Sequence, residues 1–249
     1  MSSTALAWPR SYWRQSRAHR YSLLFALPLL VAYEVMAAIL GHGEAQAIRN
    51  GADVLLKSVF LTLLGAQGPL VFGALLIGVS LWLLVRDMRA HGSRLSPRIF
   101  AGMMAESVVL GLAFGIVVSS VTSQVLAPFA AMVQAPMERL DTATQLMVSL
   151  GAGLYEELLF RVILVGAISA LGIRLLGWRP VTAGVVAVGL GALIFSAFHY
   201  IGPFGDPLEP GSFTFRLVAG IFFSALFVTR GFGITAWTHA LYDVFLLLG

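Results

Sequence analysis

The stretch YSLLFALPLLVAYEVMAAIL, residues 21–40, runs for twenty residues with a single charged side chain, Glu34. An α-helix needs about 20 apolar residues to cross the hydrocarbon core of a bilayer. The rest of the 249-residue chain has the same character, since 58% of its residues are hydrophobic and 11% are charged, whereas a soluble domain has about 25% charged residues. The composition predicts a membrane-embedded protein and excludes soluble, disordered and nucleic-acid-binding folds.

Six further stretches of the sequence are long and apolar in the same way: about 69–85, 99–127, 142–170, 181–200, 213–229 and 232–248. A shorter stretch, 52–66, contains Asp53 and Lys57 and is predicted to be a re-entrant or interfacial helix. We therefore expect an all-α, polytopic bundle of seven membrane helices, or eight if 52–66 also crosses the bilayer.

The arginines mark the loops between these stretches. Segments 1–20 and 86–98 hold four arginines each, and the positive-inside rule places such loops on the cytoplasmic side. We expect an integral protein of the bacterial inner membrane with a cytoplasmic N-terminus. A single membrane domain is expected, in which a basic interfacial segment, 1–20, is followed by the membrane helices of 21–141 and by those of 142–249, which carry the polar residues considered next.

Three short polar clusters lie inside the last apolar stretches: YEELLFR at 155–161, FSAFH at 195–199 and HALYD at 239–243. A charged side chain at the centre of a membrane helix costs roughly 2.5–3.5 kcal/mol on insertion scales, so these clusters are candidate functional sites. The chain has no cysteine, which excludes thiolate metal sites and cysteine nucleophiles. The carboxylates and imidazoles of the three clusters are considered next.

Helical spacing separates the two acids of the first cluster. Glu157 and Arg161 are four residues apart, which places them on one helix face in the orientation that favours an ion pair. Glu156 points about 100° away from Glu157 and needs a partner on another helix. A purely structural interpretation, in which these residues only tie helices together by salt bridges, stays open at this point.

The two intramembrane histidines are candidate partners for Glu156. His199 ends one apolar stretch, and His239 lies four residues before Asp243 on the same helix face. If Glu156, His199 and His239 converge, they can bind a divalent metal such as zinc, because two histidines and a glutamate are a known catalytic zinc set. Alternatively, Glu156 acts as a general base without a cofactor while a histidine polarises the water or stabilises an oxyanion.

Two other classes of function use or tolerate the same groups. A proton-coupled transporter or channel would pass protons along a relay of these acids and histidines. A non-catalytic immunity or binding protein of the membrane would require none of them.

Two further features of the spans have structural explanations. Glu106 is expected to line the cavity, to pair with Arg94 or Arg98, or to reach the membrane interface. Three glycines of the stretch 181–200 are expected to allow close helix packing: Gly184, Gly189 and Gly191.

The three polar clusters, in this order, resemble the motifs of a known family. EExxxR at 156–161, FxxxH at 195–199 and HxxxN/D at 239–243 are similar to those of the CAAX protease and bacteriocin-processing (CPBP) intramembrane proteases, a family that includes the Ras-converting CAAX prenyl endopeptidase. Each motif alone carries little information, but the ordered set on late membrane helices is specific. The resemblance covers roughly residues 142–249.

The resemblance implies an intramembrane endopeptidase whose partners are the lipid bilayer and a membrane-anchored protein or peptide substrate, without nucleic acid. It implies that Glu156 activates the attacking water, that His199 helps to hold this water or a metal, and that His239 and Asp243 shape the oxyanion side. Three supporting residues are implied as well: Glu157, Arg161 and Phe195. Prenyl-processing members have Asn where this chain has Asp243, and an ionised Asp243 cannot donate a hydrogen bond. It would have to be protonated, orient His239 or ligate a metal.

Overall fold

The structure is a computed structural model that describes residues 11–40, 49–127, 141–202 and 205–248. Within these ranges all regular secondary structure is helical, which confirms the predicted all-α class. Residues 1–10 of the predicted interfacial segment lie outside the described residues, whereas residues 11–16 form a helix.

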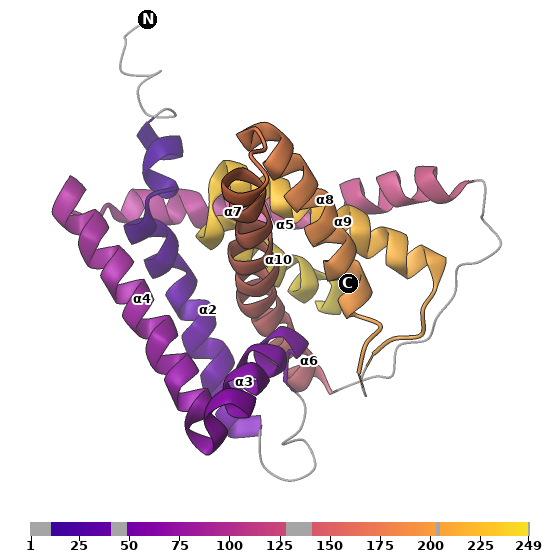
Figure 1. The fold of residues 1–249 in the computed structure, drawn as a ribbon, viewed down its shortest axis with the longest axis horizontal. Helices are drawn as coiled ribbons and strands as arrows, with labels where there is room; N and C mark the ends of the chain where they lie inside the picture. The colour runs from indigo at the N-terminus through magenta and orange to yellow at the C-terminus, as the bar shows by residue number, and fades with distance from the viewer. Residues whose placement is uncertain (1–10, 41–48, 128–140, 203–204, 249) are drawn as a thin grey trace, which may run out of the picture.

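All seven stretches predicted to cross the membrane are helical (Figure 1). The bounds of the helices are α2 His19–Leu40, α3 Gly51–Leu64, η2 Gly65–Gln67, α4 Gly68–His91, α5 Pro97–Leu126, α6 Thr142–Gly151, η4 Ala152–Val165, α7 Gly166–Leu175, α8 Pro180–Phe198, α9 Pro210–Arg230 and α10 Phe232–Leu248. Among the described residues, six helical segments are long and apolar enough to cross a membrane, and α10 is a shorter apolar helix. The polytopic bundle is therefore confirmed.

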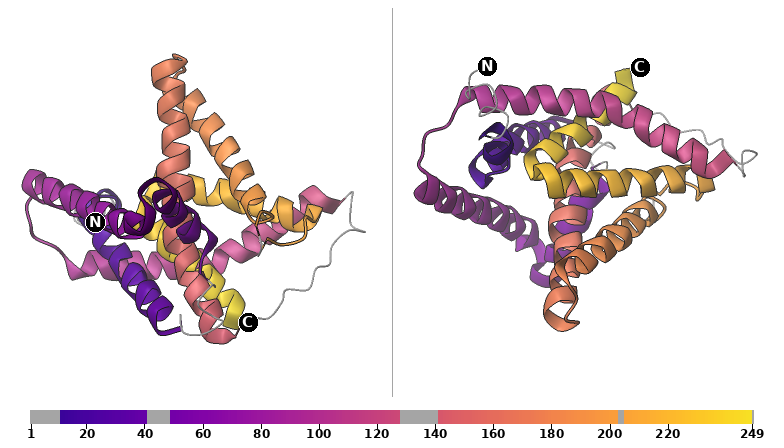
Figure 2. Two further views of the ribbon diagram at one scale, coloured as in Figure 1. Left: turned by 60° about the horizontal axis from the view of Figure 1, so that its bottom comes forward. Right: turned by 90° about the horizontal axis from the view of Figure 1, so that it is seen from above.

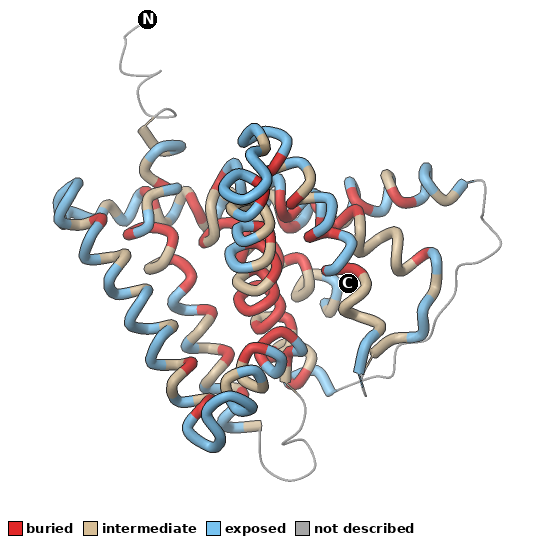
Figure 3. Tube along the Cα trace, viewed as in Figure 1, coloured by how far each residue is buried: buried red, intermediate tan, exposed pale blue. Residues whose placement is uncertain are grey.

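One long helix, formed by α6, η4 and α7 without a break, runs through the middle of the bundle (Figures 1 and 2). Its middle part, η4, contacts α10, α8 and α3, so three helices from distant parts of the sequence meet there. Figure 3 shows buried residues concentrated along this central helix, while much of the outer side of α4 is exposed.

Helix α2 shows how the sequence divides between the core and the lipid. Leu27, Val31, Val35 and Ile39 recur every four residues and are exposed, so they form one apolar stripe on the outer side of the helix. Leu29 and Tyr33 on the opposite side are completely buried. An exposed stripe with only aliphatic side chains suits contact with lipid tails and would be unfavourable in water.

The predicted re-entrant or interfacial segment 52–66 forms the short helix α3. Asn50 caps its first turn by accepting a hydrogen bond from the backbone N–H of Ala52. At the other end, Gly65 adopts a φ of 60°, a conformation that only glycine adopts without strain, and the chain turns back into α4. Helix α3 packs against α4 and η4, near the end of the bundle that lies lowest in Figure 1.

The arginine-rich connections lie at the opposite end. In Figure 1 the start of α2, the end of α4 and the connection between α7 and α8 are all at the upper edge. This common end is what the loop-charge prediction requires, and its cytoplasmic orientation stays a prediction.

Candidate active site

The two adjacent carboxylates lie on η4, which is a π-helix. A π-helix has i→i+5 hydrogen bonds and is rare, and where it occurs it is frequently at a functional site. The α-helical geometry that was assumed for Glu156, Glu157 and Arg161 therefore does not hold in this part of the predicted stretch 142–170. The acids still point to different partners, because the Nε of Arg161 lies 3.2 Å from Glu157 Oε2 while Glu156 faces other helices.

Glu156 finds two partners on two other helices. Its Oε1 accepts a hydrogen bond from the side-chain amide of Asn50 at 2.8 Å, and its Oε2 lies 3.9 Å from His199 Nε2. A separation of 3.9 Å is too long for a hydrogen bond, so these two atoms face each other without closing. Glu156 also lies within electrostatic range of His239.

The proton on His199 is placed by its backbone contact. His199 Nδ1 lies 2.8 Å from the carbonyl oxygen of Phe195, an atom that only accepts, so Nδ1 carries the proton in a neutral ring. The Nε2 lone pair then faces Glu156. His199 follows the last residue of α8, where the helix ends and the ring is partly exposed.

His239 is held by Glu157 from the central helix. His239 Nδ1 lies 2.7 Å from Glu157 Oε1, and its Nε2 lies 3.8 Å from Asp243 Oδ2. The ring stacks on Phe223, with 4.2 Å between centroids. Glu157 is fully buried between His239 and Arg161, so it links the π-helix to α10.

Phe195 is the contact shared by these groups. Its ring lies 4.4 Å from the Arg161 guanidinium carbon, 4.9 Å from the His199 ring and 6.4 Å from the His239 ring. None of the Arg161 nitrogens has a hydrogen-bond partner among the described residues. The guanidinium instead rests against aromatic faces and beside Glu157, an arrangement that cation–π attraction stabilises.

The structure therefore brings all seven predicted site residues into one region, where η4, the end of α8 and α10 meet. In the part of the chain that the structure describes, no three His, Asp or Glu side chains are grouped closely enough to hold a metal ion. The predicted set of Glu156, His199 and His239 is not gathered in that way. Zinc dependence stays a prediction.

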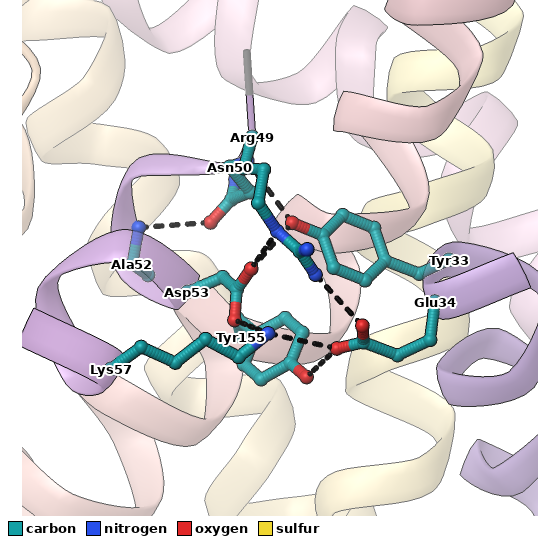
Figure 4. Close-up of polar contacts among 8 residues, drawn as sticks. All are labelled: Tyr33, Glu34, Arg49, Asn50, Ala52, Asp53, Lys57 and Tyr155. Carbon is teal, nitrogen blue, oxygen red and sulfur yellow. Dashed lines mark hydrogen bonds and ion pairs between the residues drawn. The ribbon is translucent and has the colours of Figure 1, made fainter. Parts of the chain in front are cut away.

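A second polar cluster beside Glu156 was not predicted from the sequence (Figure 4). Glu34 on α2 contacts Arg49 at 2.8 Å, Lys57 at 3.1 Å and the Tyr155 hydroxyl at 2.6 Å. Asp53 contacts the same Arg49 and Lys57, both at 2.7 Å. These two acidic and two basic side chains neutralise one another, and Glu34 contacts Tyr155, the residue that precedes Glu156.

The acidic residues of this cluster stabilise the positive charge of Arg49. Burial alone would lower the pKa of the guanidinium, but the carboxylates of Asp53 and Glu34 raise it above its ordinary value. The Asp53–Lys57 spacing of four residues in an apolar stretch was visible in the sequence. The contact of Asn50 with Glu156 was not visible in the sequence, because the two residues are 106 residues apart. The pairing of Glu34 with Arg49 and Lys57 was not visible either.

Comparison with known proteins gives one match. Residues 139–245 match the family of type II CAAX prenyl endopeptidases described as Rce1-like. Neither the curated proteins nor the solved structures give a significant match to the chain. The matched residues contain all three polar clusters. Residues 139–245 of this chain are thus similar to the Rce1-like type II CAAX prenyl endopeptidases, which confirms the resemblance that the three motifs indicate.

Proposed function

We propose that this protein is an intramembrane endopeptidase that hydrolyses a peptide bond of a membrane-associated protein or peptide. The observation that carries the proposal is the open pair of Glu156 and His199, whose Oε2 and Nε2 atoms face each other at 3.9 Å from separate helices. A carboxylate and an imidazole lone pair in this arrangement can accept both hydrogen bonds of a single water molecule. The family match supports the protease class.

The reaction would begin with a water held by Glu156 and His199. Glu156 takes one proton as general base while the water oxygen forms a bond to the substrate carbonyl carbon, whose π electrons move to the oxygen and give an oxyanion. Glu156 then returns the proton to the amide nitrogen as the C–N bond breaks. The products are a carboxylic acid and an amine, and the enzyme is regenerated.

His239 is placed to stabilise the oxyanion. Its Nδ1–H donates to Glu157, and a protonated ring, whose charge the carboxylates of Glu157 and Asp243 would balance, donates from Nε2. Donors fixed in a water-poor site are effective because they need no reorganisation during the reaction. In this scheme Asp243 acts through His239 and has no need to donate a hydrogen bond itself.

The position of His199 suggests the direction of substrate access. It lies at the C-terminal end of α8, away from the connection between α7 and α8, where Arg174 and Arg179 lie. If that connection is cytoplasmic, the substrate approaches from the outer half of the membrane.

The test uses the full-length protein in lipid vesicles with two fluorescent peptides, one carrying a prenylated C-terminus and one a transmembrane helix. Cleavage is followed by mass spectrometry. Glu156→Gln removes the proton acceptor at nearly constant size, so the cleavage rate should fall by about 10²–10⁴-fold while the melting temperature stays close to that of the wild type. Unchanged cleavage in Glu156→Gln would refute the mechanism, and proton flux across the vesicles that depends on Glu156 would favour a transporter.

A chelator added to the same vesicles tests the cofactor. Cleavage that persists indicates that Glu156 acts without a metal. Cleavage that is lost and then restored by Zn²⁺ indicates a metal-bound water.

A further inference from the structure

Asn50 uses both ends of its side chain. Its carbonyl oxygen accepts from the backbone N–H of Ala52 at 2.9 Å and so caps α3, while its amide nitrogen donates to Glu156 Oε1 at 2.8 Å. The residue is 2% exposed, and its own backbone N–H donates to the Tyr33 hydroxyl at 3.2 Å. Asn50 lies outside the three motifs and outside the residues that match the family.

We propose that Asn50 is a positioning residue for the reaction, which holds the Glu156 carboxylate in the rotation that turns Oε2 towards His199. This inference rests on the proposed function. The terminal torsion of a glutamate side chain has a broad energy minimum, so the helix that carries Glu156 does not by itself fix which way the carboxylate faces. A hydrogen bond from a buried amide to one oxygen fixes it and leaves the other oxygen for the water.

The charged cluster of Figure 4 keeps Asn50 in place. The Tyr33 hydroxyl, which accepts from the Asn50 backbone, donates to Asp53 at 2.8 Å. Glu34 accepts from the hydroxyl of Tyr155, the residue immediately before Glu156. The cluster therefore contacts both the start of α3 and the central helix, on either side of the Asn50–Glu156 hydrogen bond. Its two acidic and two basic side chains neutralise one another, which suits a structural support and leaves no net charge to bind a ligand.

Substitutions can separate the two roles of Asn50, which are to cap α3 and to donate a hydrogen bond to Glu156. Asp and Asn are equally good N-caps, so Asn50→Asp keeps the cap of α3 but loses the N–H donor and places a second carboxylate beside Glu156. We expect kcat to fall by about 10–100-fold, the range seen when a supporting hydrogen bond to a catalytic group is removed, with KM within about twofold. The ratio of the mutant kcat to the wild-type kcat should rise as the pH falls, because a protonated carboxyl group donates where a carboxylate cannot.

Two further variants keep the test decisive. Asn50→Ser retains the cap but is too short to reach Glu156, so it should lose kcat similarly even if Asn50→Asp fails to fold. Asp141→Asn changes the N-cap of α6, whose side chain accepts hydrogen bonds from the first turn of its own helix, and should leave kcat unchanged. A kcat within twofold of the wild type in folded Asn50→Asp or Asn50→Ser overturns this inference, whereas the proposed mechanism is overturned by a Glu156→Gln variant that remains active.

Discussion

Two of the pairs of ionisable residues in this bundle, Glu106–Arg230 and Glu156–His199, are built differently. Glu106 on α5 and Arg230 at the end of α9 form a closed pair, with Arg230 Nε and Nη2 at 2.5 and 2.6 Å from the two carboxylate oxygens. The Trp13 ring covers the guanidinium at 3.9 Å. Glu156 and His199, in contrast, remain 3.9 Å apart.

The difference separates a structural contact from a reactive one. The closed pair uses both carboxylate oxygens and the guanidinium fork, and it ties the N-terminal segment to α5 and α9. A bidentate geometry of this kind is strong and specific, and the Tyr12 hydroxyl donates to the same carboxylate as well. The open pair keeps one carboxylate oxygen and one imidazole nitrogen for a third molecule.

The largest combined effect is expected at Glu157, which belongs to both types of contact. Glu157→Gln leaves the buried Arg161 charge without its partner, and breaking such a pair costs about 3–5 kcal/mol of stability. It also removes the carboxylate that orients His239, which should lower the cleavage rate about 10–100-fold. Chemical denaturation and vesicle cleavage measure the two losses, and a variant with wild-type stability would show that the Glu157–Arg161 contact is not a significant ion pair.

Substitution of the closed pair should have the opposite effect to substitution of Glu156, because it should lower stability and leave cleavage almost unchanged. Glu106→Gln strands Arg230 and is expected to cost about 3 kcal/mol, at the lower end of the range for buried pairs, because the Glu106 side chain is 21% exposed. Cleavage per folded molecule should stay within about twofold. Removing both charges in Glu106→Gln/Arg230→Met should be less damaging than Glu106→Gln alone. A loss of cleavage as large as that of Glu156→Gln would contradict the distinction between the two pairs.

The sequence was sufficient for the helices and for contacts within one helix. Long apolar runs predicted helices at all seven stretches, six of which lie in segments long and apolar enough to cross a membrane. The four-residue spacing predicted that Glu157 contacts Arg161, and the structure has this contact even though the local helix is a π-helix. The chemistry of the site was also visible, because buried charge is expensive and therefore rare in such a chain.

Contacts between distant segments could not be predicted from the sequence. Glu106 was expected to line the cavity, to pair with Arg94 or Arg98, or to reach the membrane interface. It pairs instead with Arg230, 124 residues away. Spacing along one helix carries no information about which faces meet across the bundle.

The glycines show the same limit. Gly184 and Gly189 were expected to permit close packing, yet no atom of a neighbouring described residue lies within 4 Å of where their Cβ atoms would be, so that expectation is wrong for both. It is right for Gly191, where a Cβ would lie 2.5 Å from Val165 Cγ2. The closest backbone approach to the site instead occurs at Gly153.

The smallest effect, and the sharpest test of the comparison, is expected at this crossing of η4 and α10. A Cβ on Gly153 would lie 2.3 Å from the carbonyl oxygen of Ala236, which is backbone and cannot yield without moving a helix. Gly153→Ala should cost about 1–3 kcal/mol, as overpacking does, and should weaken cleavage because the 2.7 Å contact of Glu157 with His239 spans the same crossing. Gly184→Ala, with open space around it, is the matched control.

Double variants connect this crossing to the two pairs. Gly153→Ala combined with Glu106→Gln should give additive losses of stability, since distant sites that share no partners act independently. Combined with Glu157→Gln it should cost less than the sum, because the helix shift caused by the added methyl group already weakens the Glu157–His239 contact. Additivity in both combinations would show that the η4–α10 crossing does not hold the open site together, and coupling in both would show that the closed pair is part of the same cooperative unit.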